Sequence, residues 1–137
     1  WKDKFGGEKS SDKTLNFSIV EDQKILTQID ELSLTGEKKP GGKITITAKI
    51  KNTGNVAYSY QIGLNVKPVG GTKITISPAD YRNERIEIGQ TVTKVFSATI
   101  PSDAKAGNWE AYSAVWKDKF GGEKSSDKTL NFSITGK

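Results

Sequence analysis

Three residue types are missing from this 137-residue chain, which has no cysteine, no histidine and no methionine. Without cysteine there is no thiol nucleophile and no disulfide framework, and without either cysteine or histidine the usual zinc sites are excluded. Ser-His-Asp and Cys-His catalysis need the same missing residues. We therefore expect a protein that is not an enzyme and that holds no cofactor or metal.

Long apolar runs are also missing. No stretch approaches the roughly 20 apolar residues that a membrane-spanning helix requires, so we expect no membrane span. The net charge of +5 comes from 21 basic and 16 acidic residues scattered along the chain. No cluster of arginines and aromatic residues indicates nucleic-acid binding. The lysines fit a solvated surface or, alternatively, attraction to anionic polymers such as cell-wall phosphates.

What the chain does contain is an alternation of apolar and polar residues with a period of two, which indicates β-strands. The stretch "GKITITAKIKNTG" is a clear example, with isoleucine and alanine alternating against threonine and lysine. In "KILTQIDELSLTG" the phase changes between Ile29 and Leu32, which predicts a β-bulge or a switch of sheet. The predicted strands are residues 25–35, 43–52, 55–67, 72–77, 91–100, 108–118 and 128–135.

Turn residues separate these strands. The stretches "TGEKKPGGK" and "NTGN" supply Gly, Pro and Asn, and "VKPVGGTKI" predicts a hairpin through Gly70 and Gly71. The one segment that suggests a helical turn is "SPADYRNER". Short alternating strands with one apolar face each are typical of an antiparallel β-sandwich. We predict an all-β fold, a seven-stranded antiparallel Ig/Fn3-like sandwich over residues 20–137.

Two stretches carry a resemblance to a known family, "KPGGKITITAKIKNTGNVAY" and "IEIGQTVTKVFSATIPSDAKAGNWEAYSAVWKD". They resemble the adhesion-related Ig-like domains of bacteria and archaea, the CARDB and NEW3-type modules. The matching positions are Pro40, Gly41, Asn52, Thr53, Gly54, Asn55, Gly89, Pro101, Ala106, Gly107 and Trp109. The resemblance covers about residues 38–118 and rests on turns. It implies an Ig/Fn3-like spacer or accessory module of large surface proteins, often in tandem, with no shared catalytic residues.

One segment, "WKDKFGGEKSSDKTLNFSI", occurs twice, at residues 1–19 and 116–134, an offset of 115 residues. Nineteen identities in a row indicate a duplication, and 115 residues is an ordinary domain length. The simplest interpretation is a tandem array of such domains, in which residues 1–19 are the tail of the preceding one. The chain starts at Trp1 rather than Met, so we expect a processed product or a piece of a longer protein.

The second interpretation is that the two copies compete for the same place in the sheet. Both copies carry the same apolar face, so we assign a strand-exchange role to Leu15, Phe17, Ile19, Leu130, Phe132 and Ile134. Within one chain only one copy can fill the last-strand position. The other is then an unpaired strand that can enter another molecule by domain swapping or strand donation. We expect residues 1–19 to be disordered or to make an intermolecular sheet contact.

Two aromatic residues are candidates for ligand binding. Tyr112 and Trp116 have the opposite phase from Trp109 on their strand, so we expect them to face outward, where such rings can stack on a sugar. The alternative is that Trp116 covers a sheet edge or a junction between domains. Tyr58 and Tyr60 share the inward phase, and we expect their hydroxyls to reach an edge of the core.

The carboxylates offer weaker candidates. Asp118, Glu123 and Asp127 share one loop and could gather Ca²⁺, but lysines interleave them, so solvated charges are the preferred interpretation. An intramolecular Lys–Asn isopeptide bond, known in similar-looking pilin domains, needs a buried lysine, for which Lys94 is the candidate.

These observations favour a non-enzymatic spacer module of a repetitive extracellular or cell-surface protein. Its partners would be neighbouring identical repeats or other copies of itself, joined by strand exchange of the duplicated segment. The alternatives are an accessory module that binds carbohydrate or cell wall, or a self-assembling, strand-donating subunit of natural or engineered origin.

Overall fold

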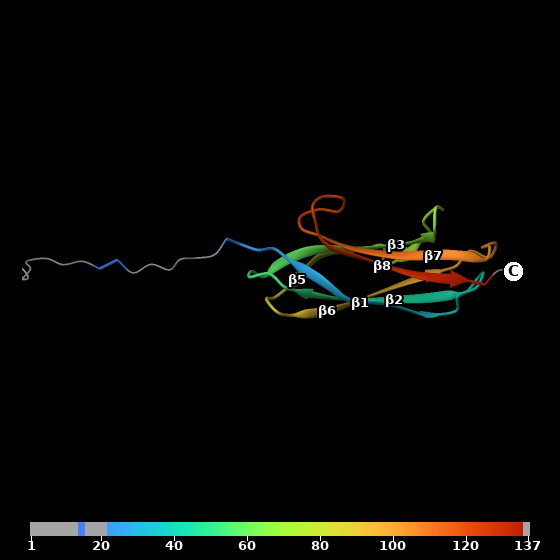
Figure 1. Ribbon diagram of the computed structural model, residues 1–137, viewed down its shortest axis with the longest axis horizontal. Coiled ribbons are helices and arrows are strands. Elements are labelled where there is room, and N and C mark those ends of the chain that lie inside the picture. Colours follow the sequence, from blue (N-terminus) through green and yellow to red (C-terminus); the bar gives the residue numbers. More distant parts are fainter. Residues whose placement is uncertain (1–13, 16–21, 136–137) are drawn as a thin grey trace, which may run out of the picture.

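The computed structural model of the chain describes residues 14–15 and 22–135. Over these residues it contains two four-stranded antiparallel sheets that pack face to face (Figure 1). The predicted all-β sandwich is confirmed, with eight strands in place of seven. Their bounds are β1 Thr27–Gly36, β2 Lys43–Asn52, β3 Tyr58–Pro68, β4 Ile76–Ser77, β5 Asp80–Ile86, β6 Thr91–Thr99, β7 Gly107–Trp116 and β8 Lys124–Ile134. The described part of the chain has no helix of the length and apolarity that a membrane crossing requires.

The two sheets differ in strand order. Sheet A has the order β1-β2-β6-β4, and sheet B has the order β5-β3-β7-β8. The additional strand is β5, which occupies the segment for which a helical turn was expected, so that prediction was wrong. The segment pairs with β3, and it places Tyr81 against Phe96 with 5.2 Å between ring centroids. β5 is an edge strand of sheet B. Its residues are mostly polar, so its sequence shows little of the alternation of apolar and polar residues by which strands are recognised.

The predicted hairpin through Gly70 and Gly71 forms, but its return segment pairs with β3 over a short stretch only. The turn itself forms, because Gly70 has a φ of 80° and the N–H of Gly71 donates to the carbonyl of Pro68 at 2.8 Å. Beyond the turn, the N–H of Ile74 donates to the carbonyl of Val66 in β3 at 2.9 Å, and the chain then leaves sheet B and pairs β4 with β6 in sheet A. This crossover buries Ile76 between the sheets.

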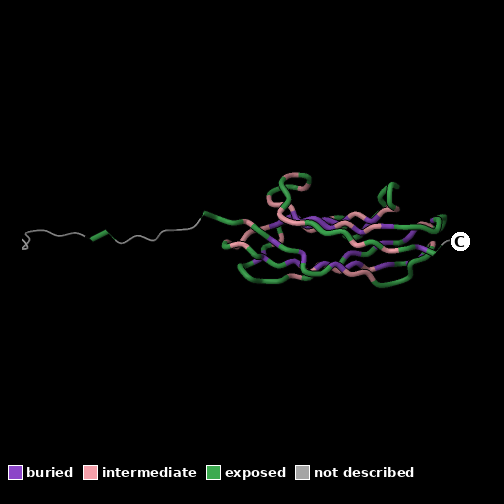
Figure 2. The backbone as a smooth tube through the Cα atoms, viewed as in Figure 1, coloured by how far each residue is buried: buried purple, intermediate pink, exposed green. Residues whose placement is uncertain are grey.

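The core lies between the inner faces of the two sheets, where the apolar residues of each strand alternate with outward polar residues (Figure 2). The register of β1 shifts between Ile29 and Glu31, and both Ile29 and Leu32 are buried, which confirms the predicted bulge. Fully burying such an aliphatic side chain contributes about 1.5–3 kcal/mol. The core is therefore one continuous apolar layer, mostly aliphatic, with Tyr60, Phe96 and Trp109 as its buried aromatic residues.

Tyr58 and Tyr60 show where one detail of the core prediction was wrong. The hydroxyl of Tyr58 reaches the sheet edge and donates to Asp118. The Tyr60 side chain is fully buried, and its hydroxyl has no hydrogen-bond partner among the described residues. Because β3 continues past Tyr60 into the middle of sheet B, this hydroxyl stays inside the apolar layer.

The chain enters and leaves the sandwich at opposite ends, as Figure 1 shows. At the N-terminal pole lie the start of β1 and the turns after β2 and β5, joined by hydrogen bonds from Thr53 to Leu26 and from Gly89 to Asn52. At the C-terminal pole lie the end of β8 and the turns after β1, β3 and β6. There the N–H of Thr135 donates to the carbonyl of Lys38 at 3.1 Å.

The second copy of the duplicated segment supplies β8, which pairs with β7 along its whole length. Of its three apolar residues, Ile134 is buried, while Leu130 and Phe132 are partly buried against the core. The last-strand position of the sandwich is thus filled from the same chain. Of the first copy, Phe17 and Ile19 lie outside the described residues, and Leu15 is 78% exposed.

Candidate ligand-binding face on sheet B

The outer face of sheet B carries the two aromatic residues that the sequence singled out. Along β7, Trp109 and Ser113 are buried in the core, whereas Tyr112 and Trp116 are half-buried on the opposite side. Their outward orientation agrees with the alternation of the strand. Their role as sugar-stacking residues stays a prediction.

Trp116 lies directly over Gly63 of the neighbouring strand β3. A Cβ atom added at Gly63 would come within 3.0 Å of the indole ring and within 2.9 Å of the Asp80 carboxylate. A residue with a side chain at this position would therefore push the ring off the sheet. The glycine allows the indole to rest on the backbone, which is a common reason for glycine inside a strand.

Further side chains gather around the Trp116 ring. The Phe120 ring, from the loop after β7, meets it edge-on with 5.5 Å between centroids. The Arg82 guanidinium lies 4.9 Å from the centroid of Phe120, a cation–π distance. Arg82 also lies 3.9 Å from the carboxylate of Asp80. We call these five residues, Gly63, Asp80, Arg82, Trp116 and Phe120, the Trp116 cluster.

Tyr112 belongs to a second group on the same face. Its hydroxyl donates to the Asp127 carboxylate at 2.7 Å and accepts from the Lys124 ammonium at 2.8 Å. Hydrogen bonds from Tyr112 and Lys124 hold the pKa of Asp127 below its usual value. Partial burial, followed by the bond to Asp127, raises the pKa of Tyr112. The hydroxyl is therefore engaged within this trio, and the Lys124 ammonium also lies 5.4 Å from the centroid of the Tyr112 ring, a cation–π distance.

The distance between the two aromatic positions limits what they can bind. Tyr112 and Trp116 are four residues apart on one strand, which corresponds to about 13 Å at the usual rise per residue. The two rings are therefore too far apart to contact the same sugar unit. A ligand that touches both has to be extended, as a glycan chain is.

The two carboxylates of the loop after β7, Asp118 and Glu123, each contact a hydroxyl or an ammonium group. Asp118 accepts from Tyr58, and Glu123 pairs with the Lys117 ammonium at 3.0 Å. In the described ranges, 14–15 and 22–135, no group of three or more acidic side chains is arranged to hold a metal ion. Lys94, the isopeptide candidate, faces inward beside Tyr81 and forms an ion pair with Glu84.

Sequence reasoning did not connect Trp116 with the other four members of the Trp116 cluster. Arg82 and Phe120 come from β5 and from the loop after β7, and no local pattern links either of them to Trp116. Gly63 did carry a signal, because an isolated glycine inside a strand indicates a bulge or a close approach. Its partner could be identified only from the register of β3 against β7, in which Gly63 lies opposite Ala114.

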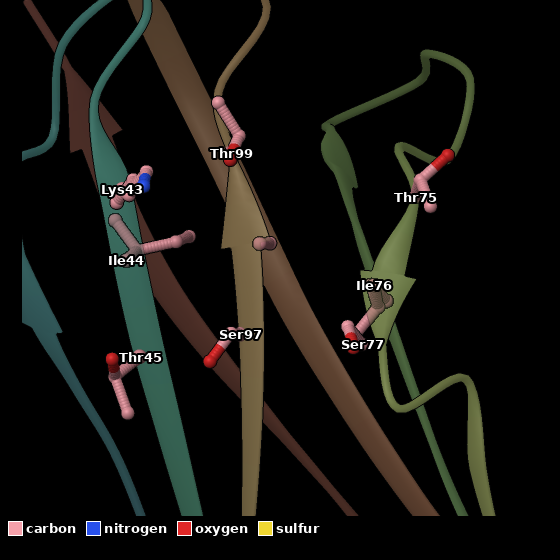
Figure 3. Close-up of a pocket in the computed structure, with 9 residues that line it drawn as sticks. Lys43, Ile44, Thr45, Thr75, Ile76, Ser77, Ser97 and Thr99 are labelled. Carbon is pink, nitrogen blue, oxygen red and sulfur yellow. The ribbon is translucent and has the colours of Figure 1, made fainter.

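Sheet A carries a different feature, a shallow hollow of about 480 Å³ between β2, β6 and β4 (Figure 3). Figure 3 places Thr45 on β2, Ser97 on β6 and Ser77 on β4, and their register sets the three side by side. Its lining combines hydroxyl side chains with Lys43 and with the apolar residues Ile44, Ile76 and Ala98, and no aromatic side chain lines it.

Fold and surface together define a two-layer antiparallel β-sandwich with an aromatic outer face on one sheet. No protein-family model matches the sequence, and no curated protein does so either. Among solved structures, the chain is similar to the C-terminal domain of wzt, with a TM-score of 0.61 and 9% sequence identity. The match covers 84% of this chain and 77% of that one. At this identity the likeness shows the fold alone.

Proposed function

We propose that the protein is a non-enzymatic spacer module, of the CARDB/NEW3 type, from a repetitive extracellular or cell-surface protein. The observation that carries the proposal is the position of the two chain ends at opposite poles of the sandwich (Figure 1). Copies joined through such ends extend in one direction, so that each copy adds its full length to the array.

The duplicated segment supports this proposal. Residues 116–134 form the end of β7, the loop that follows it and the whole of β8. The identical residues 1–19 are then the corresponding piece of a preceding domain. The offset of 115 residues matches the extent of the sandwich, whose described part ends at Thr135.

Strand exchange is the feature of the proposal that has a direct test. The pairing of β7 with β8 is complete within the chain, so a donated first copy has to displace the β8 of another molecule. Size-exclusion chromatography with light scattering, on the whole chain and on one lacking residues 1–19, separates the two cases. Monomers in both cases make the first copy a tail of a neighbouring repeat. A dimer or ladder that collapses on truncation makes assembly through the duplicated strand the function.

A second candidate is a module that binds carbohydrate or cell wall, favoured by the aromatic outer face of sheet B. A Trp116→Ala variant should lose at least tenfold in affinity for a bound polysaccharide while it stays folded, because stacking on a sugar needs the exposed ring. Val95→Ala is the matched control, since Val95 is an exposed apolar residue on sheet A. Equal binding by both variants and the parent would remove this candidate.

A further inference from the structure

The two poles of the sandwich both expose apolar side chains. At the N-terminal pole, Leu26 is 45% exposed and Ile88 is 60% exposed. At the C-terminal pole, Val69 is 58% exposed and forms part of a groove of about 550 Å³. The groove lies between the segments that follow β3 and β6, and its apolar lining includes Pro68, Val69, Ile74, Pro101, Ala104 and Trp109. Each pole therefore leaves apolar surface in water.

The groove lies where the chain leaves the domain. Ile134, the last residue of β8, pairs with Gly107, and Gly107 itself lines the groove. Whatever follows β8 in an array consequently starts at the rim of this groove.

The duplication gives the length of the connection between consecutive repeats. In the sequence, Ile19 of the first copy corresponds to Ile134, the last residue of β8. The following domain begins no later than Asp22, whose carbonyl accepts from the Asn55 side chain at 3.0 Å. Only Val20 and Glu21 lie between these points, and the connection from residue 19 to residue 22 spans at most about 11 Å.

A connection this short forces the two poles together. Flexible linkers between independent domains need many residues, because their reach grows only with the square root of their length. With two linking residues, the N-terminal pole of one repeat has to abut the C-terminal pole of the repeat before it. The apolar surfaces of the two poles then face each other at the junction between the repeats.

We propose that the groove at the C-terminal pole is the docking site for the N-terminal pole of the following repeat, with Ile88 of that repeat seated in it. The inference rests on the proposed function, because it concerns consecutive copies of this chain. Docking buries Ile88 and Val69 together and makes the array a stiff rod with coupled repeats. This is how repeat proteins gain stability from their nearest-neighbour interfaces.

The test uses the full chain with residues 20–134 inserted a second time after Ile134. Docked repeats should unfold together, at a higher midpoint than the original chain, and small-angle scattering should show one extended rod. Ile88→Asp in the second repeat should lower this midpoint by about 3 °C or more beyond its effect in the original chain. Val69→Asp in the first repeat should do the same. Val95→Asp, on the side of sheet A, should have equal effects in both chains.

Two failures can be told apart. If both repeats fold but unfold at the midpoint of the original chain, and Ile88→Asp acts equally in both chains, the poles do not dock and the spacer proposal stands. If the inserted repeat fails to fold beside the first, or the chain forms intermolecular ladders, the proposed tandem array is wrong, and so is the docking proposal that rests on it. The original chain carrying Ile88→Asp shows whether the substitution alone impairs folding.

Discussion

The outer faces of the two sheets differ far more than their inner faces do. Both inner faces are mainly aliphatic, with Phe96 on sheet A and Tyr60 and Trp109 on sheet B, and Phe96 is the single aromatic residue in the strands of sheet A. The outer face of sheet A carries small hydroxyls, and Thr35, Thr45, Ser97 and Ser77 form one row across its four strands. The outer face of sheet B carries Tyr112 and Trp116. The candidate ligand positions therefore lie on one sheet only.

The comparison shows that neighbouring residues decide whether an aromatic ring can rest on the outer face of a sheet in this fold. Trp116 rests on Gly63 because the adjacent strand has no side chain there, and Phe120 and Arg82 close in from two other segments. On sheet A, the row formed by Thr35, Thr45, Ser97 and Ser77 consists of small hydroxyl side chains, and no aromatic ring packs on it. Four pairs of substitutions test how far such positions depend on their neighbours, beginning with the largest expected effect.

The two tryptophans of β7 should differ most. Trp109 is 3% exposed and lies 6.3 Å from the Phe132 ring centroid, so Trp109→Ala should lower the free energy of unfolding by about 3–5 kcal/mol. Trp116→Ala on the outer face should cost about 1–2 kcal/mol, because only part of its ring leaves water on folding. Urea denaturation of both variants measures the difference. Equal losses would mean that Trp116 belongs to the core.

Asn52 joins the two sheets at the N-terminal pole. Its buried side chain donates to the carbonyls of Val56 and Ile86, each at 2.9 Å, and accepts from the N–H of Gly54. Asn52→Ala leaves these backbone groups unpaired and should cost about 2–3 kcal/mol. Asn131→Ala, at an exposed position of β8, is the control and should change the free energy of unfolding by less than about 0.5 kcal/mol. Chemical denaturation of both variants checks the pair, and similar losses would contradict this role of Asn52.

Tyr60 should behave in the opposite sense, because its buried hydroxyl has no partner within the described part of the chain. Tyr60→Phe removes the polar atom without changing the shape of the ring, and it should raise the free energy of unfolding by about 1 kcal/mol. Tyr58→Phe is the matched control and should be neutral or slightly destabilising, since it removes the bond to Asp118. A loss of stability in Tyr60→Phe would reveal a partner for this hydroxyl. Thermal or urea unfolding of the two variants decides between these results.

The smallest effect concerns Asp127 on the outer face of sheet B. Its pKa in the folded protein lies below the ordinary value of 3.8, because Tyr112 and Lys124 donate to its carboxylate. The ionised carboxylate therefore stabilises the fold fully at pH values above its ordinary pKa. This stabilisation is lost as the pH falls through the lower pKa of the folded state. Since the group is exposed, the loss should be at most about 0.5 kcal/mol.

Unfolding measured between pH 6 and pH 2 should therefore show a slightly shallower acid loss for Asp127→Asn than for the parent. Asp30→Asn, an exposed carboxylate on sheet A, provides the comparison between the faces. An unchanged acid profile in Asp127→Asn would mean that the Tyr112 trio contributes nothing to stability in solution.

The sequence by itself determined the strands, their inward faces and the bulge in β1, because alternation with a period of two is a local property of each segment. It also placed Tyr112 and Trp116 on an outer face and revealed the duplication. It did not determine that β4 crosses to sheet A, that "DYRNERI" is an edge strand, or that Gly63, Arg82 and Phe120 surround Trp116. Those features join residues that lie far apart in the chain, so they exist only once the sheets have paired in register and packed together.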